Sequence, residues 1–220
     1  MFKKLASIFQ KSPSPKTQPA KRYSFRWHEI GSENPFNMRV LDVRSLTNNI
    51  IATTTDPRIA ESYLRLRQND GKNLKNAAIT EPCTVHCSLK FPHNGTQLEG
   101  IVSKADSMDV KWDIYIYDGI FYFARSWTGE LMFKAPAKVA RDAINIFEIE
   151  CRRSDEDLAP SHVFFLLGSH AMGRVLPHRV PLPSDAGPMQ IATTSFSLFG
   201  NKANYAAFDD ITQISLFPKR

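Results

Sequence analysis

Residues 112–125 read WDIYIYDGIFYFAR and carry the strongest structural signal in the chain. Two runs of β-branched and aromatic residues, Trp112–Tyr117 and Ile120–Arg125, flank the pair Asp118-Gly119. Such side chains favour strands, and an Asp-Gly pair between two strand-like runs is typical of a two-residue hairpin turn. The sequence therefore predicts an antiparallel hairpin at this place.

A second turn, at Thr128-Gly129, extends the hairpin into a meander. The run that follows, residues 130–134, is again strand-like, so we predict three antiparallel strands around residues 112–134. Further strands are predicted at residues 38–43, 50–55, 84–91 and 144–151. An antiparallel sheet is therefore expected at the centre of the fold.

Two helices are predicted from their end signals. Asp56 can cap a helix that starts at Pro57 and ends at residues 69–71, Asn-Asp-Gly. The second helix, residues 160–172, is largely apolar and should be deeply buried. Residues 191–216 show no clear period, so helix and strand both stay open there. Because strands and helices do not alternate regularly, we predict an α+β fold with two or three helices packed on one side of an antiparallel sheet.

The positive charge of the chain is concentrated at one end. The net charge is +6, yet residues 1–26 hold seven of the 28 Lys and Arg residues and no acid, which leaves 21 basic and 22 acidic residues elsewhere. A near-neutral body does not favour sequence-specific nucleic acid binding. Residues 12–20, SPSPKTQPA, cannot form a packed element. We therefore predict a basic flexible tail, residues 1–22, and a single globular α+β domain, residues 23–220.

The first 11 residues, MFKKLASIFQK, could form a short amphipathic helix, because large apolar residues recur at helical spacing between lysines. Such a helix could contact an anionic membrane surface weakly through residues 1–11. The alternative is a frayed, solvated terminus, since so short a helix is marginal alone in water. The expected location is the cytoplasm, with a peripheral position at the inner membrane surface as the alternative.

The cysteines and the known catalytic motifs give no sign of a particular chemistry. Cys83, Cys87 and Cys151 have neither the paired spacing of a zinc site nor the even count of a disulfide framework. The sequence contains no glycine-rich phosphate loop, no GxSxG and no HExxH. We therefore predict no metal and no cofactor, and leave open whether the protein is an enzyme.

The strongest candidate for a ligand site is the turn Arg125-Ser126-Trp127-Thr128-Gly129, which we call the 125–129 turn. An arginine, two hydroxyls and a glycine in one turn can hold a phosphate or carboxylate through a bidentate cation and accessible backbone N–H groups. Trp127 could stack on a base or another ring. In the alternative interpretation, Trp127 packs in the core, Arg125 pairs with a neighbouring acid, and Thr128 and Gly129 only make the turn.

Two residues elsewhere could complete such a site. Arg44 shares a strand face with Asp42, so the two could clamp a ligand or form a structural ion pair. His170 could act as a general base, because imidazole titrates near neutrality, although no matching nucleophile is visible and a structural histidine is the alternative. The candidate ligand-binding residues are Arg125, Ser126, Trp127, Thr128, Arg44 and His170.

Four groups of residues stand out together: NPF at 34–36 with LDVRS at 41–45, KWDIY at 111–115, FARSWTG at 123–129 and SFSLFG at 195–200. In these strings the chain resembles a family of uncharacterised bacterial proteins that share an Arg-Ser-Trp-Thr-Gly hairpin motif. The resemblance covers most of residues 33–208 and implies no activity, ligand or site residue. It supports only the view that residues 27–220 form one unit.

Two classes of function fit these observations. The first is a non-catalytic cytoplasmic interaction domain, an accessory or immunity-type protein that binds another protein. The missing catalytic motifs and the near-neutral body favour it. The alternative is an enzyme or binder that acts on a phosphorylated small molecule or nucleotide through the 125–129 turn.

Overall fold

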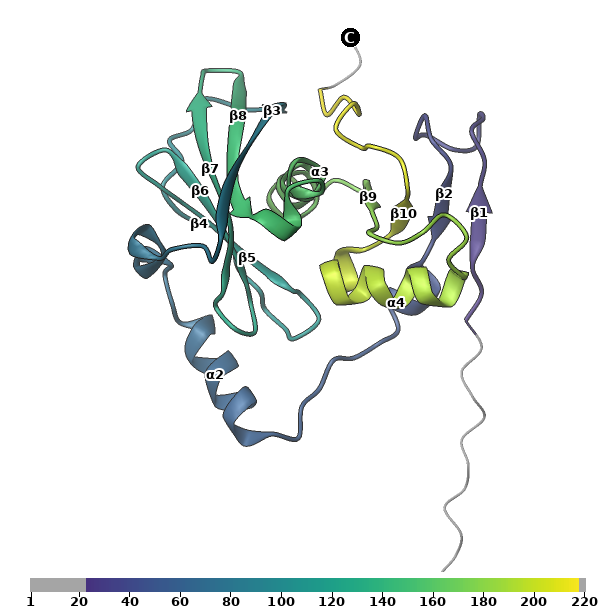
Figure 1. Cartoon of the computed structure of the whole chain (residues 1–220), viewed down its shortest axis with the longest axis horizontal. Helices are drawn as coiled ribbons and strands as arrows, with labels where there is room; N and C mark the ends of the chain where they lie inside the picture. Colours follow the sequence, from purple (N-terminus) through teal and green to yellow (C-terminus); the bar gives the residue numbers. More distant parts are fainter. Residues whose placement is uncertain (1–22, 218–220) are drawn as a thin grey trace, which may run out of the picture.

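The computed structural model describes residues 23–217, which form two β-sheets with helices between and beside them (Figure 1). The large, six-stranded sheet is antiparallel throughout, in the order β3-β8-β7-β6-β5-β4. Its strands are β3 (Pro82–Pro92), β4 (Gly100–Ser103), β5 (Trp112–Tyr117), β6 (Ile120–Arg125), β7 (Leu131–Val139) and β8 (Ala143–Arg152).

The hairpin predicted at residues 112–125 forms at the predicted positions. Trp112 pairs with Arg125 at one end and Tyr117 with Ile120 at the other. Asp118 has φ 51° and Gly119 has φ 73°, so both turn residues adopt the left-handed conformation that a two-residue turn of this kind requires. β7 follows as the third strand, which confirms the predicted meander.

A small, four-stranded sheet in the order β1-β2-β10-β9 stands apart from the large one. β10 runs antiparallel to β2 and parallel to β9, so this sheet joins the two ends of the described chain. The strand predicted at residues 50–55 is wrong, because this segment is β-branched but pairs with no strand in the described part of the chain. The small-sheet strands are β1 (Arg26–His28), β2 (Val40–Asp42), β9 (Pro177–Arg179) and β10 (Tyr205–Ala207).

The two predicted helices are present, and a third long helix lies in the stretch whose structure the sequence left open. The helix predicted at 160–172 begins as an α-helix and widens in its last turn into a π-helix, in which the N–H of Met172 donates to the carbonyl of Leu167. The helices are α1 (Arg44–Thr47), α2 (Pro57–Arg67), α3 (Ala159–Leu166), the π-helical turn η3 (Leu167–Ala171) and α4 (Pro188–Phe199), with 3₁₀ turns η1 (Lys72–Asn76), η2 (Arg153–Asp155) and η4 (Gly200–Lys202).

α3 lies between the two sheets, in contact with β3, β8 and β9 (Figure 1). Trp112, Ile114 and Ile116 of β5 point to this side and join one buried cluster with α3 and α4. Tyr115 and Tyr117 point to the opposite face, where η1 covers them. The fold is thus α+β, with α3 and α4 packed on one side of the antiparallel sheet.

The amphipathic helix predicted in residues 1–11, and the membrane contact predicted for it, lie outside the described residues. Within residues 23–217, no helix has the length and apolar character needed to cross a membrane.

Candidate functional site

The 125–129 turn connects β6 to β7 by a short backbone loop. The N–H of Gly129 donates to the carbonyl of Arg125 at 2.8 Å, and the N–H of Arg125 donates to the carbonyl of Glu130 at 2.9 Å. Gly129 has φ +70°, and a Cβ there would lie 2.8 Å from the side chain of Leu66 in α2. The positive φ of this turn therefore favours glycine, and a larger residue would also have to move the end of the Leu66 side chain.

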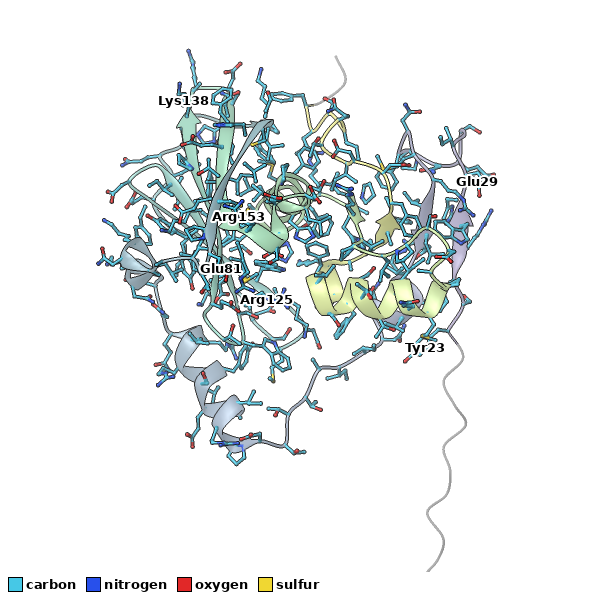
Figure 2. All side chains as sticks on the ribbon, in the orientation of Figure 1. Tyr23, Glu29, Glu81, Arg125, Lys138 and Arg153 are labelled. Atoms are coloured by element: carbon cyan, nitrogen blue, oxygen red, sulfur yellow. The ribbon has the colours of Figure 1, made fainter. Side chains whose placement is uncertain are left out.

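Arg125 lies where the large sheet meets α4 (Figure 2). Its guanidinium donates to the carbonyl of Ser197 at 2.8 Å and to that of Leu198 at 2.9 Å. It also sits over the ring of Trp112, 4.8 Å from the centroid, and the Trp112 indole donates to the same Leu198 carbonyl at 2.6 Å. Carbonyls in the last turn of a helix lack intrahelical donors, and a cation stabilises that end of the helix dipole. Arg125 therefore caps the C-terminal end of α4.

The next two residues of the turn bind the loop that precedes β5. Ser126 Oγ donates to the carbonyl of Val110 at 2.6 Å, and Trp127 Nε1 donates to the carbonyl of Met108 at 2.8 Å. Lys111 lies over the Trp127 ring at 4.3 Å, and burial lowers its pKa to about 8. The turn thus joins the hairpin, the 108–111 loop and α4 into one junction.

These contacts leave little in the turn for a ligand. The guanidinium of Arg125, the hydroxyl of Ser126 and the indole of Trp127 all donate to backbone carbonyls of the chain. Thr128 is exposed, and its hydroxyl accepts the N–H of Glu130 at 3.3 Å. The partners of Arg125 are carbonyls and not the neighbouring acid that the alternative interpretation expected.

Arg44 forms an ion pair with Asp42 at the start of α1. Its Nε lies 3.0 Å from Oδ1 of Asp42, and its guanidinium rests on the ring of Tyr205 at 4.8 Å. Partial burial raises the pKa of Asp42, but hydrogen bonds from Arg44 lower it further, so that the pKa lies below its usual value. This is the structural ion pair that was one of the two predictions for Arg44.

His170 lies in the π-helical turn η3, with its Nδ1 2.8 Å from the hydroxyl of Ser169 and its ring against Phe165. Burial lowers its pKa to about 3, so it is a poor proton acceptor near neutral pH. No hydrogen bond or ion pair among the described residues joins His170, Arg44 and Arg125 to one another. Each of the three side chains is instead held by its own partners: Asp42 and Tyr205 for Arg44, the α4 carbonyls for Arg125, and Ser169 and Phe165 for His170.

The sequence analysis missed a cluster of buried histidines and phenylalanines between the sheets. His162 and His178 both meet the ring of Phe199, at 5.2 Å and 5.1 Å between centroids, and Phe165 also contacts His178. Neither ring nitrogen of His178 has a hydrogen-bond partner among residues 23–217. Burial lowers the pKa of His162 to about 4 and that of His178 to about 3, so both rings are neutral parts of the core.

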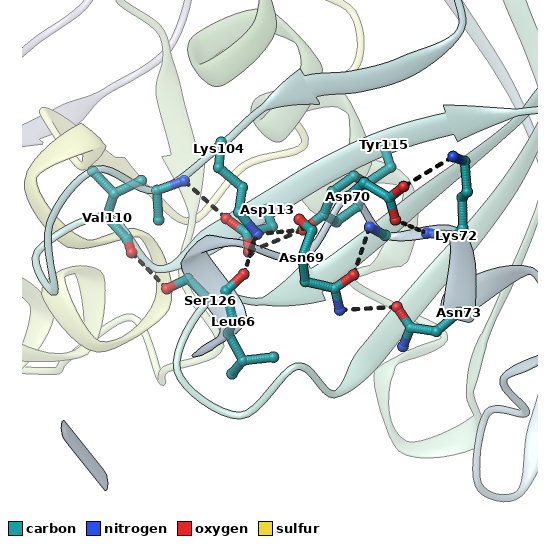
Figure 3. A network of polar contacts seen from close by, with 12 residues as sticks. Leu66, Asn69, Asp70, Lys72, Asn73, Lys104, Val110, Asp113, Tyr115 and Ser126 are labelled. Carbon is teal, nitrogen blue, oxygen red and sulfur yellow. Dashed lines mark hydrogen bonds and ion pairs between the residues drawn. The ribbon is translucent and has the colours of Figure 1, made fainter. Parts of the chain in front are cut away.

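A second polar network holds the C-terminal end of α2 on the large sheet (Figure 3). Lys104 Nζ donates to the carbonyl of Leu66 and to Oδ2 of Asp113, both at 2.7 Å, and to the hydroxyl of Tyr115 at 2.5 Å. Asp113 is buried and also accepts the N–H of Ala105 at 2.8 Å. The network therefore ties the C-terminal end of α2 to β5 through Lys104.

We call residues 51–67, which comprise α2 and the loop before it, the α2 arm. Tyr63 is the one buried residue of the helix, whereas Ile51, Ile59 and Leu64 are 78%, 41% and 58% exposed. Ile59 lies one helical turn before Tyr63, so the apolar stripe of the helix continues beyond the body that buries Tyr63. Figure 1 shows α2 at the periphery, with the extended loop of the arm leading back toward the small sheet. The exposed apolar residues on this arm are the strongest candidate binding surface.

The comparisons add no family to this picture. No family model, curated protein or solved structure with which the chain was compared matches it. The resemblance to a bacterial family therefore stays a prediction. Within residues 23–217, no group of three or more His, Cys, Asp or Glu side chains is placed to hold a metal ion.

Proposed function

We propose that the chain is a non-catalytic interaction domain that binds another protein through the α2 arm. The observation that carries the proposal is the exposure of Ile51, Ile59 and Leu64 on a peripheral segment anchored at its C-terminal end. Ile51 lies in the loop before α2, and Ile59 and Leu64 are five residues apart on the helix, so the arm exposes apolar surface on more than one side. A partner that covers these side chains would remove apolar area from water.

The charge of α2 defines the partner further. Arg58, Arg65 and Arg67 are exposed, and Glu61 is the one acid of the helix. A protein with an apolar groove bordered by Asp and Glu complements both features, in the manner of a helix that lies in a groove. The arginines would speed association in a salt-dependent way, and the apolar residues would supply most of the affinity.

A function in binding phosphorylated small molecules or nucleotides has weaker support. It rests on the 125–129 turn, where Arg125, Ser126 and Trp127 already donate to backbone carbonyls. A phosphate there would have to displace the Arg125 guanidinium from the two carbonyls that it caps at the C-terminal end of α4.

The test is site-specific photo-crosslinking in the cells that produce the protein. A photoreactive phenylalanine analogue replaces Leu64 in one variant and Phe147 in the control, because Phe147 is also half-exposed, at 48%, but lies on the outer face of β8. We expect one defined protein adduct from position 64 and none from position 147.

Two results would contradict the proposal. The first is the absence of any adduct at position 64, with the variant shown to be folded by its circular dichroism spectrum. The second is unspecific capture, in which the adduct from position 64 persists after Ile59→Ser is added and position 147 gives an equal yield of adduct.

A further inference from the structure

Two cysteines that are 68 residues apart in the sequence, Cys83 and Cys151, lie directly opposite each other on neighbouring strands of the large sheet. Cys83 is the second residue of β3, which is an edge strand, and Cys151 is the last residue but one of β8. Their sulfur atoms are 3.7 Å apart, and both cysteines are free thiols. The pairing of β3 with β8 therefore holds two thiols in contact.

The strand pairing also sets the two backbones at a separation that a disulfide can span. The N–H of Arg153 donates to the carbonyl of Glu81 at 3.0 Å, so these two residues form a hydrogen-bonded pair. Such pairs recur at every second residue of an antiparallel ladder, so Cys83 and Cys151 form the next one, with Cα atoms about 5.5 Å apart. Disulfides most often have this Cα separation, and the sulfurs need to approach by only about 1.7 Å to bond.

The two thiols differ in their exposure. Cys151 is fully buried in the core cluster that includes α3, whereas Cys83 is half-buried at the edge of this cluster. Burial raises the pKa of Cys151 to about 12, so this thiol stays protonated near neutral pH. Oxidation of a cysteine follows its exposure and its thiolate fraction, so a small oxidant should react with Cys83 first. Cys151 is then the thiol that lies next to the oxidised sulfur.

The third cysteine, Cys87, lies on the same face of β3 as Cys83 but has a different neighbour. Its thiol donates to the carbonyl of Ile146 in β8 at 3.6 Å, and burial raises its pKa to about 11. A register shift between His86 and Leu89 interrupts the strand pairing at this place. Cys87 therefore faces a backbone carbonyl and not a thiol, which makes it an internal control for the other two cysteines.

We propose that Cys83 and Cys151 are a redox-sensitive thiol pair that a peroxide converts into a disulfide, which joins the edge strand β3 covalently to β8. The thiolate of Cys83 attacks one oxygen of hydrogen peroxide and the O–O bond breaks, which gives a sulfenic acid and a hydroxide that takes up the proton released by Cys83. The sulfur of Cys151 then attacks the sulfur of Cys83, the S–O bond breaks, and hydroxide leaves with the proton of Cys151 as water. Both thiols are oxidised, the peroxide is reduced to two waters, and a dithiol reduces the bond again.

The test is peptide mapping by mass spectrometry of the full chain after treatment with an equimolar amount of hydrogen peroxide. The remaining thiols are blocked with iodoacetamide in denaturant before digestion. We expect a pair of peptides joined through Cys83 and Cys151 that separates on reduction with dithiothreitol, whereas Cys87 carries the iodoacetamide label. A bond from Cys83 to Cys87 or between two chains in place of this pair would overturn the proposal, and so would full labelling of all three cysteines.

Three variants separate the roles of the thiols. Cys87→Ser is the matched control and should form the disulfide as the parent does. Cys83→Ser removes the more exposed partner and should lose thiols to peroxide at least about tenfold more slowly than the parent. Cys151→Ala keeps an apolar side chain in the core and should leave Cys83 as a sulfenic acid, which dimedone traps. Loss of thiols from Cys83→Ser at the parent's rate would refute the assignment of Cys83 as the residue that reacts first.

A second readout tests the covalent link between the strands. Because the bond joins residues that are 68 positions apart, the oxidised parent should melt at least about 4 °C above the reduced parent. Cys87→Ser should show the same rise on oxidation, and Cys83→Ser should show none. Equal melting temperatures of the oxidised and reduced parent would contradict a link that stabilises the edge of the sheet.

Discussion

Replacement of Arg125 by alanine tests whether the 125–129 turn is a structural junction. The variant removes two hydrogen bonds from a charged donor to Ser197 and Leu198 and the stacking of the guanidinium on Trp112. The Leu198 carbonyl keeps the Trp112 indole as donor, so we count one charge-assisted hydrogen bond as lost, about 2 kcal/mol. The cation–π contact adds about 1 kcal/mol.

We therefore expect Arg125→Ala to lower the free energy of unfolding by about 3 kcal/mol, measured by urea denaturation with circular dichroism. For a chain of this length, the melting temperature should fall by about 6–12 °C. Arg44→Ala is the control, because it removes an ion pair with Asp42 worth at most about 1 kcal/mol and a contact with the Tyr205 ring worth about 0.5–1 kcal/mol, a smaller total than for Arg125→Ala.

The opposite result would refute the interpretation of the 125–129 turn as a structural junction. If Arg125 served a ligand and not the fold, its removal would leave stability unchanged or raise it, because functional residues often trade against stability. An Arg125→Ala protein with the urea midpoint and slope of the parent would contradict the structural role.

Three further predictions concern the core. Burial lowers the pKa of His178 to about 3, so its ring stays neutral in the folded protein, whereas in the unfolded chain it takes up a proton below about pH 6.5. The neutral ring therefore contributes its full stability above about pH 6.5, and this contribution falls as the pH drops toward 3, by about 2 kcal/mol at pH 5. Urea titrations at pH 7 and pH 5 should show that His178→Phe loses this part of the pH dependence. A Cβ at Gly200 would lie 1.7 Å from a backbone oxygen, so Gly200→Ala should cost more than about 2 kcal/mol by thermal denaturation, whereas Gly187→Ala, with open space around it, should cost less than about 1 kcal/mol. Asp113→Asn leaves Lys104 without its buried carboxylate and should lower the urea-derived stability by about 3 kcal/mol, and a neutral effect would show that the pair is dispensable.

The sequence predicted those parts of the fold whose causes are local. Asp118-Gly119 and the β-branched runs beside it determine the hairpin within 14 residues, and Asp56-Pro57 marks the start of α2 as predicted. The small sheet could not be predicted in the same way. Its strands have three residues each, and Tyr205 pairs with Asp42, so the pairing depends on contacts between distant parts of the chain.

The candidate site shows the same division between local and distant causes. The 125–129 turn is unusual in sequence because an arginine, a serine and a tryptophan occur together, and the structure gives the reason. Arg125 needs acceptors, but they are the carbonyls of Ser197 and Leu198, more than 70 residues further along the chain. Sequence alone could not distinguish such internal acceptors from an external phosphate. Likewise, the spacing of Ile59 and Tyr63 predicts a helix but not that the body covers only Tyr63.

The measurement that tests the proposed function most directly is the affinity of the cross-linked partner for the parent chain and for the double variant Ile59→Ser, Leu64→Ser. Both side chains are exposed, so the double variant should fold like the parent, and Phe147→Ser is the control at an unrelated exposed site. By calorimetry, we expect the double variant to bind at least about 30-fold more weakly, and Phe147→Ser to bind as the parent does. Equal affinity of the parent and the double variant would contradict a binding surface on the α2 arm.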